Sequence, residues 1–506
     1  MRQSKRKQAE HPTFPHDTSP SHVSLHAKTK IKEVDVDTTN DAAPSFLDGN
    51  NGPNPYLSVI FPLLLVYVSN QWSRSSIYYL VNFSDSASVT AQNAMNVDIG
   101  FSQAQYGALA SVAFTALFAF ASLAAGNLAD RSDRKLLTAV SAVAWSVATV
   151  ATASASSYGE VVAARIFMGL ACAFSTPSAY TLIRDLVPSD RAALASSIYG
   201  SGVYLGGALA SLSILLDNSL GWRGALGTIA AYGLVSAGLS YAVLPPDPKR
   251  NIVDDAGQSS KEKDQTTVDN ESSEQLSSII TDATDVLSTS RVRWLFAASF
   301  FRFCSGLCIG VWAAPYFRLA FPDDSTSYAV VNAFIVSLCG VTSGVVGGWS
   351  ADKAGAAAVR AGSNENAGRL AVPIVGSLLA VPTWWFAVHS PTFELAMFWL
   401  GMEYLVAECW FGPVVAVLQS SVGSGLGGTA QGMFTLCGAV GNFAPSALGI
   451  LYGQAAATTV EDGSALSSLL GTGVCAGYIL SAVCFTISAQ ASNEGTGKAS
   501  LLEKQS

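Results

Sequence analysis

The stretch Gly126-Asn-Leu-Ala-Asp130-Arg131-Ser-Asp-Arg134-Lys135 directly follows an apolar segment that is long enough to cross a membrane. A similar stretch, Gly348-Trp-Ser-Ala-Asp352-Lys353, follows another apolar segment 222 residues further along the chain. Gly, Ala, Asp and a basic residue recur in both stretches at the same spacing. Such a repeat indicates a duplicated set of membrane helices, as found in many transporters.

The composition supports a membrane protein. Half of the 506 residues are hydrophobic and 13% are charged, whereas a soluble domain carries about 25% charged residues. The mean hydropathy is +0.34, which excludes an ordinary soluble enzyme. The net charge of −8 argues against a nucleic-acid binder, which needs a basic face. The 44 glycines are typical of packed membrane helices.

Twelve apolar segments have about the 20 residues that a membrane-spanning helix needs. They are residues 56–81, 104–127, 136–155, 158–180, 192–216, 224–244, 292–318, 328–350, 369–389, 393–418, 429–452 and 466–488. We therefore expect an all-α membrane protein with twelve transmembrane helices in two six-helix bundles. The expected parts are a disordered cytoplasmic tail (1–52), an N-terminal bundle (53–244), a cytoplasmic linker (245–290), a C-terminal bundle (291–490) and a second cytoplasmic tail (491–506).

The basic residues indicate how these helices are oriented. If the N-terminus is cytoplasmic, most loop Lys and Arg residues fall on the cytoplasmic side, and the opposite loops hold mainly Asp and Glu, with Arg223 and Arg318 as the exceptions. This distribution follows the positive-inside rule and predicts that both termini are cytoplasmic. No sorting signal distinguishes the plasma membrane from a lysosomal or vacuolar membrane.

Cysteine and histidine usage argues against redox, metal or His-based chemistry. All eight cysteines lie in apolar segments, where packing is a better explanation than a disulfide framework. Cys304 and Cys308 lie one helical turn apart, and small packing residues are favoured over a metal pair. Four of the five histidines lie within residues 1–52, and only His389 is near a span. We predict no catalytic residue, no metal site and no cofactor, and no ATP-binding Gly-x-x-x-x-Gly-Lys-Ser/Thr loop is present.

The stretch from Gly126 to Lys135 resembles the signature loop between the second and third helices of the major facilitator superfamily. This resemblance implies two six-helix bundles around a central cavity that opens alternately to either side. It also implies a monomer whose partners are its solute and the membrane lipids, and no nucleic acid. The residues that the resemblance makes a conformational gate are Gly126, Asp130, Arg131, Arg134 and, from the repeat, Asp352. Asp130 is expected to pair with Arg134 or another cytoplasmic Arg.

Within the superfamily, the sequence most resembles the Spinster branch, which carries lysophospholipids and sphingoid phosphates. The stretches that carry this resemblance are Asp98–Gly107, Arg165 with Gly169, Asp185-Leu186 with Arg191, Tyr199-Gly200, Gly206-Gly207 and Trp222-Arg223. The family's helix-one Asp-Arg pair is Ser73-Arg74 here, and its helix-four Gly-Glu-Ala is Ala171-Cys172-Ala173. Both replaced acids are the family's usual coupling groups, so proton coupling would need another carboxylate.

Five charged residues lie in the interior of spans, away from the segment ends, where charge is costly and a functional role is the first hypothesis: Arg74, Arg165, Arg302, Glu403 and Glu408. Arg74 lies in the polar run Ser69–Ser76, which predicts contact with water or substrate; a structural pair at the helix end is the alternative. We expect Asn70, Gln71, Arg74 and Trp410 to bind substrate, and Arg165 to be structural because it begins a helix. Glu408 is the candidate coupling residue, with a salt bridge to Arg302 as the alternative.

Together these features predict a secondary transporter that moves a small organic or amphipathic solute by alternating access. A lysolipid or sphingoid phosphate is one candidate solute, and proton coupling through Glu408 is one candidate mechanism. The alternative is an uncoupled facilitator or exchanger of organic anions or sugars. A membrane-embedded enzyme is disfavoured by the lack of an acid–His pair, and a seven-helix receptor is disfavoured by the twelve spans.

Overall fold

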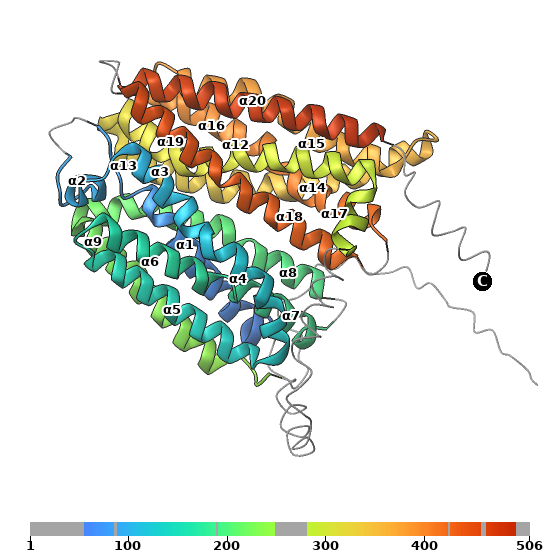
Figure 1. Cartoon of the computed structure of the whole chain (residues 1–506), viewed down its shortest axis with the longest axis horizontal. Coiled ribbons are helices and arrows are strands. Elements are labelled where there is room, and N and C mark those ends of the chain that lie inside the picture. Colours follow the sequence, from blue (N-terminus) through green and yellow to red (C-terminus); the bar gives the residue numbers. More distant parts are fainter. Residues whose placement is uncertain are drawn as a thin grey trace, which may run out of the picture. The chain divides into compact units, whose positions relative to one another are not determined.

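The computed structural model describes residues 55–84, 89–188, 191–247, 281–423, 426–456 and 462–491, and every element in these ranges is a helix (Figure 1). The side chains of residues 123–124, 126–131, 192–193 and 462–463 are not described. The predicted tail over residues 1–52 lies outside the described residues. So do most of the predicted linker and C-terminal tail.

The N-terminal half of the described chain, residues 55–247, holds six spans (blue to green in Figure 1). The first span is continuous through η1 (Tyr56–Ile60), α1 (Phe61–Ser75) and η2 (Ser76–Tyr78). It is followed by α2 (Met95–Ile99), α3 (Gln103–Ala110), α4 (Val112–Arg131), α5 (Arg134–Ser154), α6 (Tyr158–Cys172), α7 (Ser175–Leu186), α8 (Ala192–Gly200) and α9 (Gly202–Val243).

The C-terminal half, residues 281–491, holds the other six spans (yellow to red in Figure 1). Its elements are α12 (Ser290–Ala320), η3 (Pro322–Asp324), α13 (Ser325–Phe334), η4 (Ile335–Cys339), α14 (Gly340–Arg360), α15 (Glu365–His389), α16 (Phe393–Ala407), η5 (Glu408–Trp410), α17 (Phe411–Ser421), α18 (Gly427–Gly441), α19 (Phe443–Ala456) and α20 (Asp462–Gln490).

Helix α9 contains two spans, which reverse direction at Gly221. Gly221 has φ 73°, a left-handed conformation that side chains other than glycine rarely adopt. A Cβ atom there would also lie 2.8 Å from the Gln92 carbonyl oxygen. The next residue, Trp222, donates its backbone N–H to the same oxygen at 3.0 Å. The turn between the fifth and sixth spans therefore requires glycine.

This reversal explains the number of spans. Ten described helical segments are long and apolar enough to cross a membrane, and one of them, Leu194–Val243, is the double span around Gly221. The first helix, Tyr56–Tyr78, is not among the ten because its polar run lowers the hydropathy. Adding the first helix and the second span of Leu194–Val243 to the ten segments gives twelve spans in two six-helix bundles, which confirms the predicted fold class.

Side-chain caps fix where several helices begin. Ser102 and Gln105 form a reciprocal capping box at the start of α3, and Asp133 accepts from the Leu136 N–H at the start of α5. Ser157 and Thr392 cap α6 and α16 in the same way. Each cap satisfies backbone donors that the helix cannot satisfy itself. The starts of these spans are therefore encoded locally, within a few residues of the predicted positions.

Candidate functional site

At one end of the helices, here called the gate end, buried polar residues join the two halves. Arg318, near the end of α12, is 3% exposed and donates from Nη1 to the carbonyl oxygens of Tyr79 and Val81 at 2.7 and 3.1 Å. Its guanidinium lies 3.9 Å from the carboxylate of buried Asp217 in α9. One buried cation of the C-terminal half therefore holds three groups of the N-terminal half.

Asn332 of α13 adds a second link at the gate end. Its amide donates to the Tyr79 hydroxyl at 3.2 Å and to the Ser211 hydroxyl at 3.0 Å. Ser211 in turn donates to the Ala329 carbonyl at 2.9 Å. All of these side chains are buried, and buried hydrogen bonds of this kind are costly to break without replacement.

Helices α3 and α19 pack closely at the same end. A Cβ atom on Gly107 would lie 2.9 Å from the Pro445 carbonyl oxygen, and one on Gly449 would lie 2.8 Å from the Gln103 carbonyl oxygen. The hydroxyls of Ser111 and Ser446 are 2.7 Å apart. The two backbones approach this closely only because both positions are glycine.

The apolar clusters show that the molecule is closed at the gate end. The largest cluster contains residues of both halves, among them Tyr106, Trp222, Trp312 and Trp384. At the other end of the helices, two separate clusters each contain residues of one half only. One lies in the N-terminal half and includes Leu182 and Leu244, and the other lies in the C-terminal half and includes Leu370 and Leu418.

That opposite end, here called the basic end, carries a buried ion cluster in the N-terminal half. The Arg134 guanidinium binds Asp247 through Nε and Nη2, and its Nη1 lies 2.5 Å from the Asp185 carboxylate. The backbone N–H of Arg134 also donates to Asp247 at 2.8 Å. The cluster ties the start of α5 to the ends of α7 and α9.

Of the five predicted gate residues, the structure describes two side chains, those of Arg134 and Asp352. Arg134 lies in the ion cluster with Asp185 and Asp247. Asp352 is 74% exposed and lies 3.5 Å from Arg369, within the C-terminal half. The side chains of Gly126, Asp130 and Arg131 lie outside the described part of the chain. The expected Asp130 pairing therefore stays a prediction.

Arg74 and Arg165 lie close together in the N-terminal half. Their guanidinium carbons are 4.8 and 5.5 Å from the centroid of the same Phe114 ring. Among the described residues, no carboxylate lies within the 4 Å of an ion pair with either group. Arg165 lies in the middle of α6 and is 1% exposed, so the expectation that it begins a helix is wrong.

The residues beside Arg74 in α1 differ in exposure. Asn70 is buried, with 6% of its surface exposed. Gln71 and Arg74 are partly exposed. Of the three predicted substrate-binding residues on this helix, Gln71 and Arg74 are therefore the more accessible.

A second charged group lies in the C-terminal half around Arg302 of α12. Its Nη2 is 3.0 Å from the Glu408 carboxylate and 2.9 Å from the Ala407 carbonyl oxygen. The guanidinium carbon also lies 5.3 Å from the Trp410 ring centroid. The alternative for Glu408, a salt bridge to Arg302, is therefore what the structure shows.

The two carboxylates of this group have different surroundings. The Glu408 side chain is 29% exposed in its ion pair, whereas Glu403 is 2% exposed and accepts a hydrogen bond from the Tyr478 hydroxyl. Trp410 is 5% exposed, and its ring packs edge-on against Phe303. Glu408 is thus the more accessible acid, while Trp410 is largely enclosed by its own half.

The sequence did not indicate the gate-end residues Arg318, Asp217 and Asn332 as a site. Arg318 and Asp217 are placed by hydropathy at the ends of spans, where loop residues are expected. Their burial depends on partners about one hundred or more residues away in the chain. The one available signal was that Arg318 is an exception to the charge distribution.

The family model of the Major Facilitator Superfamily matches residues 63–445. This match covers well over half of the chain. The chain belongs to the major facilitator superfamily.

Relatives within the superfamily are distant. The chain is 27% identical over 192 residues to the 4-hydroxybenzoate transporter PcaK of Pseudomonas aeruginosa. This match covers 37% of this chain and 43% of that protein. It is 30% identical over 153 residues to protein spinster homolog 3 of Danio rerio. This match covers 29% of this chain and 30% of that protein. The matched segments thus span less than half the length of these relatives.

Among solved structures, this superfamily member is similar in fold to a bacterial homolog of the human lysosomal transporter Spinster in an inward-facing, unoccupied conformation. The TM-score is 0.67 at 18% sequence identity, covering 87% of this chain and 98% of that one. The resemblance to the superfamily that the sequence suggested is confirmed. The similarity to protein spinster homolog 3 and to this structure agrees with the resemblance to the Spinster branch.

Proposed function

We propose that the chain is a secondary transporter that carries a small organic or amphipathic anion by alternating access. The observation that carries this proposal is Arg74, a partly exposed guanidinium on a membrane span with no ion-pair partner among the described residues. A charge within a span is costly and is retained where it serves a function.

The charges predict which end of the helices faces the cytoplasm. The basic end carries Arg134, Lys135, Arg291 and Lys353 at the ends of spans, and the positive-inside rule predicts that this end faces the cytoplasm. The gate end, which is closed by Arg318 and Asn332, then faces away from the cytoplasm. On this basis the structure is an inward-facing state, and transport requires the gate-end links to break.

The chemistry of Arg74 favours an anion over a sugar. Its planar guanidinium binds a carboxylate or a phosphate through two parallel hydrogen bonds. Arg165 places a second positive charge nearby, against the same Phe114 ring. A neutral sugar would leave the Arg74 charge uncompensated. The similarity to a 4-hydroxybenzoate transporter, whose named solute is a carboxylate, supports this assignment.

A lysolipid or sphingoid phosphate is the second candidate, favoured by the similarity to the Spinster proteins. Its phosphate would meet the same need for negative charge at Arg74. Both solute classes would compete for Arg74 through their anionic group. They differ in their apolar part, so different protein side chains would enclose the ring of an aromatic acid and the hydrocarbon tail of a lipid. Proton coupling is proposed to involve Glu408, because it is the more accessible intramembrane acid and is held by Arg302.

Uptake into proteoliposomes tests the proposal. Purified protein would be reconstituted and offered an aromatic carboxylate, sphingosine phosphate, a lysophospholipid and a neutral hexose, each with and without a pH gradient. We expect saturable uptake of at least one anion that the other anions inhibit, and no uptake of the hexose. Arg74→Ala proteoliposomes and protein-free liposomes are the controls. Uptake of the hexose alone, or equal anion uptake by Arg74→Ala, would contradict the proposal.

A further inference from the structure

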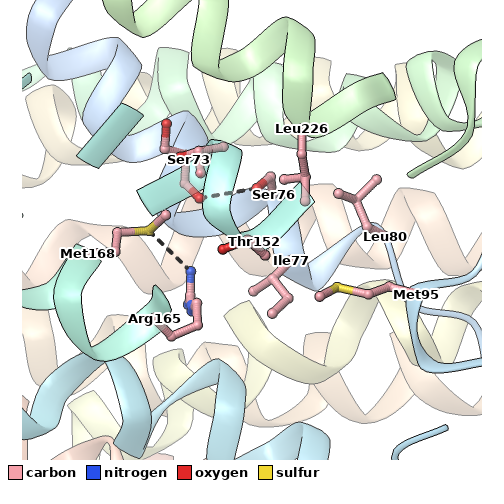
Figure 2. A pocket seen from close by; sticks show the side chains of 10 residues that line it. Ser73, Ser76, Ile77, Leu80, Met95, Thr152, Arg165, Met168 and Leu226 are labelled. Atoms are coloured by element: carbon pink, nitrogen blue, oxygen red, sulfur yellow. Dashed lines mark hydrogen bonds between the residues drawn. The ribbon is translucent and has the colours of Figure 1, made fainter. Parts of the chain in front are cut away.

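A small cavity lies inside the N-terminal half, between the first, third, fourth and sixth spans. Its lining includes Ser73, Ile77, Thr149, Thr152, Arg165 and Leu226 (Figure 2). A volume of about 10 Å³ is open to the centre of a water molecule, which is room for about one water-sized body. A free phosphate or organic carboxylate ion, which brings several heavy atoms, does not fit in this space beside the existing side chains.

Arg165 supplies hydrogen-bond donors to this cavity. Its Nη1 donates to the Arg74 carbonyl oxygen at 2.9 Å. It also lies 3.5 Å from the Met168 sulfur, a contact that is drawn in Figure 2. Its Nε and Nη2 have no hydrogen-bond partner, although the residue is only 1% exposed. The hydroxyl of Ser73, also 1% exposed and lining the cavity, has no partner either.

The charge of Arg165 is uncompensated among the described residues. No carboxylate lies within ion-pair distance, and the neighbouring Arg74 is also positive. A buried ion without a partner is strongly destabilising, and a buried donor without an acceptor adds to that cost. A negatively charged ligand of one atom would remove both costs, whereas a water molecule would remove only the second.

We propose that this cavity binds one halide ion, chloride in the cell, held by Nε–H and Nη2–H of Arg165 and by the Ser73 hydroxyl. A halide is a single atom, so it is the anion that best matches this small volume, and it accepts several hydrogen bonds at once. The ion replaces the missing carboxylate as the partner of Arg165.

The position of the cavity defines the role of the ion. Every lining residue belongs to the N-terminal half, so rearrangement of the two halves does not take the cavity apart. The ion is therefore a resident partner of Arg165 rather than a carried solute. This inference does not depend on which solute is transported, and its test does not need transport.

Thermal unfolding of the purified full-length protein tests the site. Midpoints would be measured at constant ionic strength in sodium chloride, sodium bromide and sodium gluconate. Since a ligand that binds the folded state raises stability with its concentration, we expect chloride and bromide to raise the midpoint by several degrees in a saturable manner. Gluconate, which is too large for the cavity, should not.

Two variants connect the effect to Arg165. Arg165→Met should remove the chloride dependence and be at least as stable in gluconate as the wild type, because the buried charge is gone. Ser73→Asp should also remove the dependence, since it supplies a carboxylate inside the cavity, and should match in gluconate the stability of the wild type in chloride. Thr152→Val, a cavity-lining change that leaves the charge unaltered, is the matched control and should retain the dependence.

Line broadening of the chloride-35 NMR signal gives an independent measurement of binding. The wild type should broaden the signal, bromide should compete, and Arg165→Met should not broaden it. Equal midpoints in chloride and gluconate for the wild type, or broadening that persists in Arg165→Met, would overturn the proposal. The first of these results would assign the cavity to water.

Discussion

At the scale of single residues, Arg74 is the most direct test of solute chemistry. If it binds an anionic group with two parallel hydrogen bonds, Arg74→Lys should weaken apparent affinity several-fold, because the charge remains while the paired geometry is lost. Arg74→Ala should weaken it further. Affinity would be measured by concentration-dependent uptake or by direct binding. Equal affinities in all three proteins would make Arg74 a structural residue.

Glu408 and Glu403 form a matched pair for testing coupling. Glu408 is accessible and paired with Arg302, so Glu408→Gln should abolish uphill, pH-driven uptake while leaving solute exchange intact. Glu403→Gln keeps the hydrogen bond with Tyr478 possible and should retain pH-driven uptake. The measurement compares counterflow with gradient-driven uptake. If wild-type uptake is indifferent to a pH gradient, the protein is a facilitator or exchanger.

How far the sequence predicts such sites depends on where the partners lie. Arg302 and Glu408 could be identified from the sequence because each is a charge in an apolar segment. Their salt bridge was one of two hypotheses for Glu408, and a coupling role was the other. The predicted placement of Trp410 beside a solute did not foresee its enclosure by Phe303 and Arg302. The unpaired Nε of Arg165 was not predictable, because it depends on the packing of four helices that are distant in sequence.

At the scale of helices, the contact between α3 and α19 should control the closed gate end. Gly449→Val would place side-chain atoms where the Gln103 carbonyl and the Trp312 ring now lie, and such overpacking costs about 1–3 kcal/mol. The variant should therefore favour states in which the gate end is open. Gly453→Ala, one turn further along α19, is the control, because its Cβ would lie 3.9 Å from the nearest atom.

A cross-link reports this equilibrium. Ser111 and Ser446 have hydroxyls 2.7 Å apart, so a Ser111→Cys/Ser446→Cys protein should form a disulfide under mild oxidation and stop transporting until reduced. Gly449→Val should slow the cross-linking, and Gly453→Ala should not. Equal rates in the two proteins would show that α3 and α19 do not set the gate.

Helix positions were predictable because hydropathy and caps are local signals. The break between α3 and α4 at Ser111 was not, and neither was the division of the tenth span into α16, η5 and α17. Ser111 adopts φ −121° and ψ −76° and bonds to both Gly107 and Ser446. Its conformation is thus set by a contact between the two halves rather than by its neighbours in the chain.

At the scale of the whole molecule, the charge distribution predicts sidedness. Epitope tags placed within residues 1–52, 251–290 and 491–506 should all be reached by antibody from the same face, the one bearing Arg134 and Lys353. In cells, that face should become accessible only after permeabilisation of the membrane. A tag on the opposite face would contradict either the twelve-span count or the orientation.

The apolar cluster shared by both halves at the gate end has a consequence for measured affinities. Because opening that end exposes buried aromatic surface such as Trp312 and Tyr106, which pack against each other across the two halves, molecules open to it are a minority population. A solute arriving from that side then binds with an apparent affinity reduced by the fraction of open molecules. Shifting a population from 1:99 to 99:1 requires about a 10⁴-fold preference for the favoured state. The same solute should therefore show a lower half-saturation concentration from the basic end than from the gate end, even where its contacts are identical.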